Sequence, residues 1–357
     1  MSAPSVQRMA RELLSQTPAE ASLRLRLDNL SFEIKTNRPE LVQELEGYFR
    51  PFMQAPDGEP PITVYALETP AWDCGLPLEP KEPEPGKAKI KEEYADLPGG
   101  RLVRKRLTGM VFIFGGDTNL ALGPCLENPN QVINFINNRQ IQRELEQGAL
   151  LAHAAGVCGP SLGLAMAGRA GQGKSTLALH LMSRGVTFVS NDRLMVTRDS
   201  HGPLMTGVAK LPRINPGTAL NNPDLKKVMS PQDQERFAAL PENQLWALEH
   251  KYDVDIDACF GPGRIKMGFG LGLLALLDWE RDAGPCRLAQ VELANHTDLL
   301  ASFMKEPGLF YLPPDGQPAP SQRDYLKVLA GAKVLVLSGG VDFERAADLL
   351  AEELQKS

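Results

Sequence analysis

Short apolar runs bounded by turn residues recur through the second half of the chain. The clearest are Leu162–Ala167, Thr187–Ser190 and Phe269–Leu277, which predict buried strands. Between the first two, Thr176–Arg184 carries apolar side chains at helical spacing and stops at Gly185, which predicts a helix. This alternation of strand and helix is typical of an α/β domain.

The first part of the chain mixes helical patterns with alternating ones. The predicted helices are Val6–Leu14, Glu40–Phe49 and Asn138–Gln147. The predicted strands are Leu23–Leu27, Ser31–Ile34, Pro61–Leu67, Arg101–Leu107 and Met110–Phe114, the last two as a hairpin. Residues 69–90 are rich in proline and predict an exposed loop. A length of 357 residues favours two domains, so we expect a smaller N-terminal α+β domain over 1–145 and a second domain over 146–357.

The second domain carries further predicted elements besides the three apolar runs. They are the strands Ala149–Cys158, which includes His153, Leu194–Thr197 and Lys333–Leu337, and the helices Gln232–Leu248 and Phe343–Lys356. Residues 210–225 are rich in Pro and Asn and predict a loop. The alternating acids Asp253, Asp255 and Asp257 suggest one face of a strand, with a solvated face favoured over a second metal site.

A glycine-rich motif joins the strand Leu162–Ala167 to the helix that follows it. Gly168–Ser175 has the spacing G-x-x-x-x-G-K-S of a P-loop, in which backbone N–H groups and the helix N-terminus bind phosphates. A chance match or a plain strand-to-helix turn is the alternative, but the strand before and the helix after favour a nucleoside triphosphate site. The predicted nucleotide-binding residues are Gly168, Arg169, Ala170, Gly171, Gln172, Gly173, Lys174, Ser175 and Thr176.

The strand Thr187–Ser190 ends in Asn191 and Asp192, at the edge where open α/β sheets bind ligands. Asp192 is a candidate Mg²⁺ ligand together with the Ser175 hydroxyl, or a candidate general base. Its structural alternative is a turn carboxylate that caps Arg193. His153 stands in an apolar run, where a histidine is more often a satisfied core residue than a functional one.

Composition excludes several classes of function. The net charge is −6, so a general nucleic-acid-binding surface is not expected. The five cysteines are scattered without a C-x-x-C pair, which predicts reduced thiols in a cytoplasmic protein. No stretch is long and apolar enough to predict a membrane span.

The sequence resembles HPr kinase/phosphorylase and is similar in particular to the HPr-kinase-related kinase B group. The stretches that carry this resemblance are His153-Ala-Ala-Gly-Val, GRAGQGKSTLALHLMSRG, FVSNDR (188–193), KLPRINPGT and Leu277-Asp-Trp279. The resemblance implies a P-loop core like that of phosphoenolpyruvate carboxykinase, binding ATP and Mg²⁺. It also implies a histidine beside the γ-phosphate at position 153, which tunes or relays the proton of the base. Because kinases of this family are often oligomers, it implies a possible homo-oligomer.

Two positions depart from HPr kinase. Asn191 and Asp192 stand where that family has two adjacent acids, and Lys210-Leu-Pro-Arg213-Ile-Asn replaces its E-x-R-G-[LI]-G-like segment. These departures argue against HPr as the substrate and against the reverse phosphorolysis. Lys210 and Arg213 can hold a phosphate or acidic substrate group, or they are solvated loop charges. Arg264 and Lys266 are alternatives for the same task.

The sequence therefore predicts an ATP- and Mg²⁺-dependent kinase that phosphorylates a hydroxyl, of Ser or Thr in a protein or peptide. A small-molecule hydroxyl kinase and a nucleotide-binding regulator without turnover are the two alternatives. The catalytic candidates are His153, Asn191, Asp192 and Arg213, and the metal-ligand candidates are Ser175 and Asp192.

Overall fold

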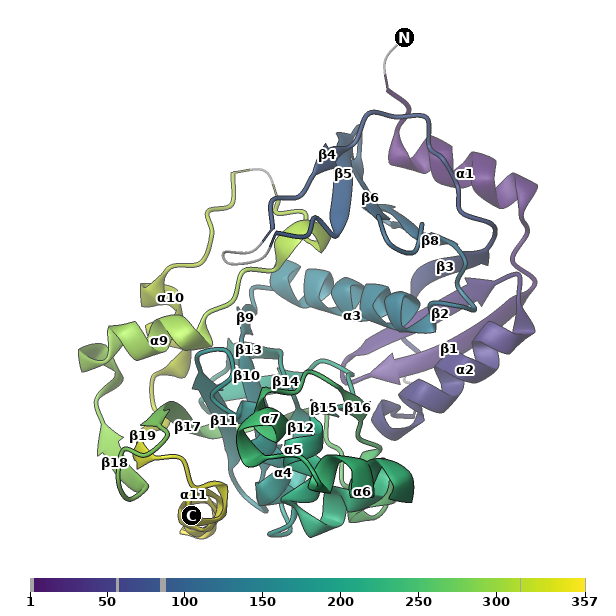
Figure 1. The fold of residues 1–357 in the computed structure, drawn as a ribbon. Helices are drawn as coiled ribbons and strands as arrows, with labels where there is room; N and C mark the ends of the chain where they lie inside the picture. Colours follow the sequence, from purple (N-terminus) through teal and green to yellow (C-terminus); the bar gives the residue numbers. More distant parts are fainter. Residues whose placement is uncertain (1–2, 56–57, 84–87, 315, 357) are drawn as a thin grey trace. The chain divides into compact units, whose positions relative to one another are not determined.

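The computed structural model describes residues 3–55, 58–83, 88–314 and 316–356, which form two compact units (Figure 1). The first unit consists of Met1–Glu146 with Pro307–Gln317, and the second of Gln147–Glu306 with Pro318–Ser357. The sequence places one boundary at 145/146 and gives no sign that a segment near residue 310 rejoins the first unit.

The first unit contains an eight-stranded sheet with the strand order β1-β2-β3-β8-β7-β6-β5-β4. β3 runs parallel to β2 and β8, and every other pair is antiparallel. The strands are β1 (Ala21–Leu27), β2 (Leu30–Thr36), β3 (Ile62–Glu68), β4 (Glu79–Pro80), β5 (Glu92–Leu97), β6 (Gly100–Lys105), β7 (Val111–Gly115) and β8 (Thr118–Gly123). The helices are α1 (Val6–Gln16), α2 (Pro39–Phe49), η1 (Arg50–Phe52), α3 (Pro129–Glu146) and η4 (Gly308–Phe310).

Strand β7 shows how helices cover both faces of this sheet. Val111 and Ile113 pack into a core with Val6 and Met9 of α1. The alternate residues of β7 point the other way, because successive side chains of a strand leave opposite faces. Phe112 and Phe114 accordingly contact Phe135 of α3, with ring centroids 4.9 and 6.1 Å apart.

Most predicted elements of the first unit are confirmed. The helix expected at Asn138–Gln147 is the second half of α3, which begins at Pro129, a residue suited to the first helical position. The polar residues Asn137, Arg139, Gln140 and Glu144 are buried on this helix. Its buried face is therefore partly polar, and the sequence shows no clear division into an apolar and a polar face. Strands β4, β5 and β8 were not predicted, and β4 lies within the expected loop 69–90. Within the expected loop 69–90, residues 84–87 lie outside the described residues.

The second unit contains a nine-stranded mixed sheet. Its strands are β9 (Leu150–Ala152), β10 (Ala154–Cys158), β11 (Gly163–Gly168), β12 (Thr187–Ser190), β13 (Leu194–Arg198), β14 (Pro203–Gly207), β17 (Gly268–Glu280), β18 (Arg287–Val291) and β19 (Lys333–Gly340). A separate short pair consists of β15 (Arg213–Ile214) and β16 (Tyr252–Asp253). The helices are α4 (Lys174–Met182), α5 (Pro216–Leu220), η2 (Pro223–Val228), α6 (Pro231–Ala238), α7 (Glu242–Ala247), α8 (Ile256–Phe260), η3 (Leu293–Asn295), α9 (Thr297–Phe303), α10 (Gln322–Leu329) and α11 (Phe343–Gln355).

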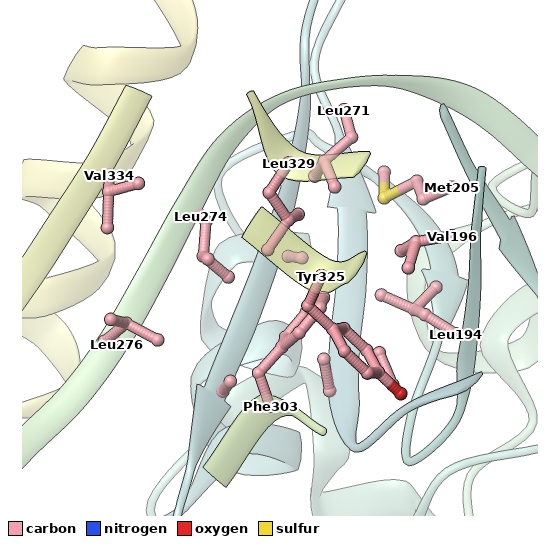
Figure 2. Close-up of a cluster of buried hydrophobic side chains, with 14 of the residues drawn as sticks. Leu194, Val196, Met205, Leu271, Leu274, Leu276, Phe303, Tyr325, Leu329 and Val334 are labelled. Carbon is pink, nitrogen blue, oxygen red and sulfur yellow. The ribbon is translucent and has the colours of Figure 1, made fainter. Parts of the chain in front are cut away.

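The long strand β17 holds this sheet together. Its first residues pair antiparallel with β14, and the rest pairs parallel with β11 and β19. Figure 2 shows the core beside it, where Phe303 of α9 and Tyr325 and Leu329 of α10 lie among strand side chains such as Leu274. Helix α4 contacts β10, β11 and β12, and α11 packs on α4. The prediction of a mixed α/β protein is confirmed.

Three expectations for the second unit are wrong in detail. The strand expected at Ala149–Cys158 is two strands, because the chain leaves β9 at His153, whose N–H donates to Phe303 O at 2.7 Å. The helix expected at Gln232–Leu248 is divided into α6 and α7, with Pro241 as the N-cap of the second. The alternating acids do not share a strand face, since Asp255 caps helix α8 and Asp257 lies in its first turn. Among the described residues, no helix combines the length and the apolar character needed to cross a membrane.

Candidate functional site

Three strand ends meet at one edge of the second unit's sheet. β10 runs antiparallel to both β11 and β12, so β11 and β12 are parallel to each other and finish where β10 begins. The segment before β10 contributes His153, β11 leads into Gly168–Ser175, and β12 leads into Asn191 and Asp192. The sheet topology therefore brings together candidate residues that are spread over about forty positions of the sequence.

The segment Gly168–Ser175, here called the glycine loop, connects β11 to α4 as predicted. Gly171 and Gly173 both have a φ of 83°, a left-handed conformation that side chains other than glycine rarely adopt. Gly173 is the N-cap of α4, so the loop delivers the chain to the helix N-terminus. Free N–H groups and the helix dipole make such a terminus a binding place for anions.

Neighbouring elements fix the shape of the glycine loop. The indole Nε1 of Trp279, at the end of β17, donates to Gln172 O at 3.0 Å. A Cβ added to Gly173 would lie 2.5 Å from Cζ of Phe343, at the start of α11. The Trp279 and Phe343 rings touch edge to face at 5.3 Å. The loop is thus held in one conformation before any ligand arrives, which lowers the entropic cost of binding.

Lys174 is buried, with 7% of its surface exposed, and its ammonium turns back onto the glycine loop. Nζ donates to Gly168 O at 2.7 Å and to Arg169 O at 3.3 Å. The pKa of Lys174 is lowered to about 8, mainly by burial; Asp192 opposes the shift and the positive charge of Lys305 adds to it. An anion placed against this ammonium would be strongly favoured, because it would compensate a charge that has lost much of its hydration.

Lys305 is a site residue that the sequence did not reveal. It follows α9, and its N–H donates to Leu151 O at 3.2 Å, which joins this segment to β9. The charge of Lys305 acts on both Lys174 and Asp192. No local motif surrounds Lys305, and only the packing of α9 brings it to this edge of the sheet.

His153 and Asp192 contact each other directly. Nε2 of His153 lies 3.3 Å from Oδ1 of Asp192, and their side chains are 27% and 41% exposed. Burial alone would raise the pKa of Asp192, but the His153 hydrogen bond and the charges of Lys305 and Arg193 hold that pKa well below its usual range. Asp192 also approaches Arg193, at 3.8 Å. His153 is therefore not an enclosed core histidine. Asp192 lies closer to His153 than to Arg193, its alternative partner in the turn.

Asn191 is buried beside this pair. Its side-chain oxygen Oδ1 is enclosed and has no hydrogen-bond partner among the described residues. A buried amide oxygen without a donor is costly, by roughly 1–3 kcal/mol. A buried group of this kind calls for an explanation, such as a water, an ion or a catalytic role.

Two hydroxyl groups stand at the first turn of α4. Ser175 is half-buried, and its hydroxyl makes no hydrogen bond with another described side chain or carbonyl. Thr176 is tied down, since its Oγ1 lies 3.0 Å from Oγ1 of Thr218 in α5. Thr176 thus fastens α5 to the glycine loop, while the Ser175 hydroxyl keeps its bonding capacity for a ligand.

Arg213 is less closely joined to the site than the other candidates. It is exposed in β15, and its Nε binds Oδ1 of Asp253 at 3.0 Å across the pairing with β16. Lys210 is half-buried, and burial lowers its pKa, with Arg193 and Arg213 adding to the shift and Asp192 opposing it. Lys210 consequently lies within electrostatic range of both Asp192 and Arg213.

Arg264 and Lys266 do not belong to this site. Arg264 donates to Val186 O at 2.6 Å and to Met182 O at 3.1 Å. The N–H of Lys266 donates to Phe188 O, near the start of β12, whereas the site lies beyond the end of that strand. Their use as substrate ligands beside the glycine loop was a wrong alternative.

The donor set can be tested against a divalent cation. No group of three or more His, Cys, Asp or Glu side chains gathers for a metal within the described ranges. Mg²⁺ does not require one, because it is usually held by one or two carboxylates together with phosphate oxygens and water. The Ser175 hydroxyl, the Asp192 carboxylate and the unpartnered oxygen of Asn191 are all hard oxygen ligands of the kind Mg²⁺ prefers.

The fold and the site define a mixed α/β protein with a glycine loop facing a carboxylate–histidine pair. No protein-family model and no curated protein sequence matches the chain. Among solved structures, the Hpr(Ser) kinase/phosphatase from Coxiella burnetii is similar with 16% sequence identity and a TM-score of 0.28, over 57% of this chain and 87% of that one. At these values the similarity carries no conclusion about function, which is inferred from the site.

Proposed function

We propose that this protein is a phosphotransferase that uses ATP and Mg²⁺ to phosphorylate a hydroxyl group, with Ser or Thr of a protein or peptide as the favoured acceptor. The observation that carries the proposal is the glycine loop with its buried Lys174, set at the same sheet edge as the His153–Asp192 pair.

The glycine loop supplies the phosphate site in this proposal. Main-chain N–H groups from Gly168 to Thr176 surround the terminal phosphates, and the N-terminus of α4 adds its positive dipole end. Lys174 exchanges its carbonyl partners for phosphate oxygens, and Lys305 adds a second cation. Neutralisation of the charge on the transferred phosphoryl group is the main catalytic task in this chemistry.

Ser175 and Asp192 are the residues that would hold Mg²⁺. When bound, the ion would offset negative charge on the transferred phosphoryl group. The low pKa of Asp192 keeps its carboxylate ionised, as a metal ligand requires. Asn191 precedes this carboxylate in the chain, and its amide would orient the acceptor hydroxyl.

The His153–Asp192 pair would receive the proton of the acceptor. The acceptor oxygen bonds to the γ-phosphorus while the bond between that phosphorus and the bridging oxygen breaks, and ADP leaves. The acceptor's proton passes to the pair, which a hydrogen bond already aligns. Lys210 and Arg213 would attract an acidic group of the acceptor.

Two other functions use the same site differently. A small-molecule hydroxyl kinase would need no protein acceptor. A nucleotide-binding regulator would bind ATP without turnover, an alternative motivated by Asn191, which leaves one carboxylate where phosphoryl transfer often uses two.

Binding and turnover measured together test the proposal. Calorimetric titration with a non-hydrolysable ATP analogue, with and without Mg²⁺, should show one site whose affinity depends on the cation. Labelled ATP incubated with the protein and a host lysate should transfer label to a protein band. Label on small molecules only would favour the metabolite kinase, and binding without any transfer or hydrolysis would favour the regulator. If the analogue does not bind, the proposal fails.

A further inference from the structure

A second concave site lies within the first unit, which carries no chemical motif. A cavity of about 470 Å³, here called the aromatic pocket, opens between α3, η4 and the β6–β7 turn. Three of its lining residues are Phe112 of β7, Phe135 of α3 and Phe310 of η4. Their ring centroids lie 4.9 to 6.2 Å apart, so the three rings pack as one cluster, in which Phe112 and Phe135 are buried and Phe310 is half-buried beside the cavity.

One wall of the aromatic pocket is polar. Gln131, Asn134 and Asn138 line it from successive turns of α3, so their amides lie on one side of the helix. The Thr108 hydroxyl binds Gln131 Oε1 at 3.1 Å and fixes that side chain. A few placed amides beside an apolar floor are typical of small-molecule sites, whose volumes are about 300–1,000 Å³.

The rim of the pocket is cationic. Lys89, Lys91, Lys105 and Arg106 line it, against the single acid Glu92. Glu92 is already compensated, because Lys105 and Lys81 both pair with it. Arg106 lies 3.9 Å from Glu93, so it is Lys89 and Lys91 that leave the mouth of the pocket with a net positive charge.

An exposed apolar side chain stands at the same mouth. Leu107 also lines the pocket, and 81% of its surface is exposed. Among the described residues, Leu107 and Leu126 are the two large hydrophobic side chains exposed to solvent. An exposed leucine beside an aromatic cavity is typical of a surface that binds an apolar ligand.

We propose that the aromatic pocket binds a small amphipathic anion, with an aromatic or branched apolar body against Phe310 and Leu107, at the edge of the phenylalanine cluster, and a carboxylate, sulfonate or phosphate at the lysine rim. The apolar body packs against Phe310, and the amides of α3 line the cavity beside it. The anion remains near the surface, where Lys89 and Lys91 attract it without being desolvated. The site is separate from the glycine loop, which lies in the other unit.

Two fluorescent probes test both halves of this proposal in the full-length protein. Anilinonaphthalene sulfonate has an aromatic body with an anion, and N-phenylnaphthylamine has the same body without it. We expect the sulfonate to bind at one site that saturating ATP and Mg²⁺ leave unchanged. Lys91→Glu should weaken the sulfonate about three- to tenfold and leave the neutral probe within about twofold, since only the anion interacts with the rim. Arg11→Glu, an exposed charge reversal on α1 of the same unit, should affect neither probe.

Asn134→Trp tests the pocket itself, because the larger side chain would fill it from the α3 wall. We expect a loss of at least about tenfold in affinity for both probes, with the melting temperature unchanged. Gln43→Trp, an exposed position on α2, is the matched control. Unchanged binding in Asn134→Trp would overturn the site, and equal weakening of both probes by Lys91→Glu would overturn the anion preference. If Asn134→Trp unfolds, Leu107→Ser at the exposed mouth replaces it and should weaken both probes, and unchanged binding of both would overturn the site.

Discussion

Lys174 in the second unit and Arg139 in the first are the two Lys or Arg side chains buried within the described part of the chain, at 7% and 4% exposure. Burial lowers the pKa of both, to about 8 for Lys174 and about 9 for Arg139. Both donate to main-chain carbonyls, Lys174 to Gly168 and Arg139 to Phe310. By burial and pKa alone the two cations would be judged alike.

Their surroundings differ in kind. The guanidinium carbon of Arg139 lies 4.3 Å from the Phe114 ring centroid and 5.2 Å from that of Phe135, so aromatic faces compensate its charge. Lys174 has an ionised carboxylate and a second lysine within electrostatic range, beside a loop with two positive-φ glycines. A perturbed cation is thus evidence of function only where its neighbours can also bind and react, and otherwise it is part of the packing.

The largest expected effect comes from Lys174→Ala. Turnover should fall about 10³-fold or more, because a buried charge-assisted contact to the terminal phosphates disappears. The melting temperature should change little, which calorimetry and a turnover assay would measure together. Lys226→Ala, an exposed lysine of the same unit, is the control. Nucleotide binding and turnover equal to the unmodified protein would remove the phosphate-site assignment.

His153→Ala should lower turnover about 10²–10⁴-fold while nucleotide affinity stays within a fewfold, if the side chain assists proton transfer. This change belongs to the comparison because His153 pairs with Asp192, the carboxylate that also acts on Lys174. Single-turnover kinetics and calorimetric titration would separate chemistry from binding. A loss of stability with full activity per folded molecule would instead make His153 a structural residue.

Arg139→Ala should do the reverse of Lys174→Ala. The first unit should lose about 2–4 kcal/mol of stability, because the change leaves a cavity between two phenylalanine rings and removes a donor from Phe310 O. Differential scanning calorimetry would report the loss, and nucleotide affinity should stay unchanged. Should nucleotide binding fail while stability holds, the distinction between the two cations would be wrong.

Asn191→Asp has a smaller expected effect, a loss of up to about tenfold in acceptor labelling with basal ATP hydrolysis unchanged. The reason is that a second carboxylate beside Asp192 would replace the amide that orients the acceptor. Labelling and hydrolysis are measured on the same preparation, with Asn295→Asp as an exposed control. A gain in labelling would show that the position of a catalytic base had been empty.

The smallest effect concerns Glu144, which is buried on α3 like Arg139. Burial raises the pKa of Glu144 to about 7, although Gln140 donates to it at 2.9 Å. Between its unfolded pKa of about 4.5 and about 7, the folded protein therefore holds a proton that the unfolded chain releases, so stability falls as pH rises. Glu144→Gln should reduce the change of melting temperature across this pH range by a few degrees, because 1 kcal/mol shifts the melting temperature by about 2–4 °C. An unchanged pH slope would contradict the assignment.

The local sequence pattern was sufficient to predict an element wherever a residue's neighbours in sequence are also its neighbours in space. The strand, glycine loop and helix from Gly163 to Met182 follow from such local rules, and so does β12, whose bounds were predicted without error. The short α5 within the expected loop 210–225 and the full length of α3 were missed, because packing rather than periodicity stabilises them.

The sequence by itself determined the motif of the glycine loop and the candidates His153, Asn191 and Asp192. Only the tertiary structure decided how they combine, because strand order and direction are set by contacts between distant segments. β10 runs antiparallel between β11 and β12, and this brings His153 to Asp192. The packing of α9 adds Lys305 to this site, and the same topology keeps Arg264 away from it. In the first unit, the return of residues near 310 completes the aromatic pocket.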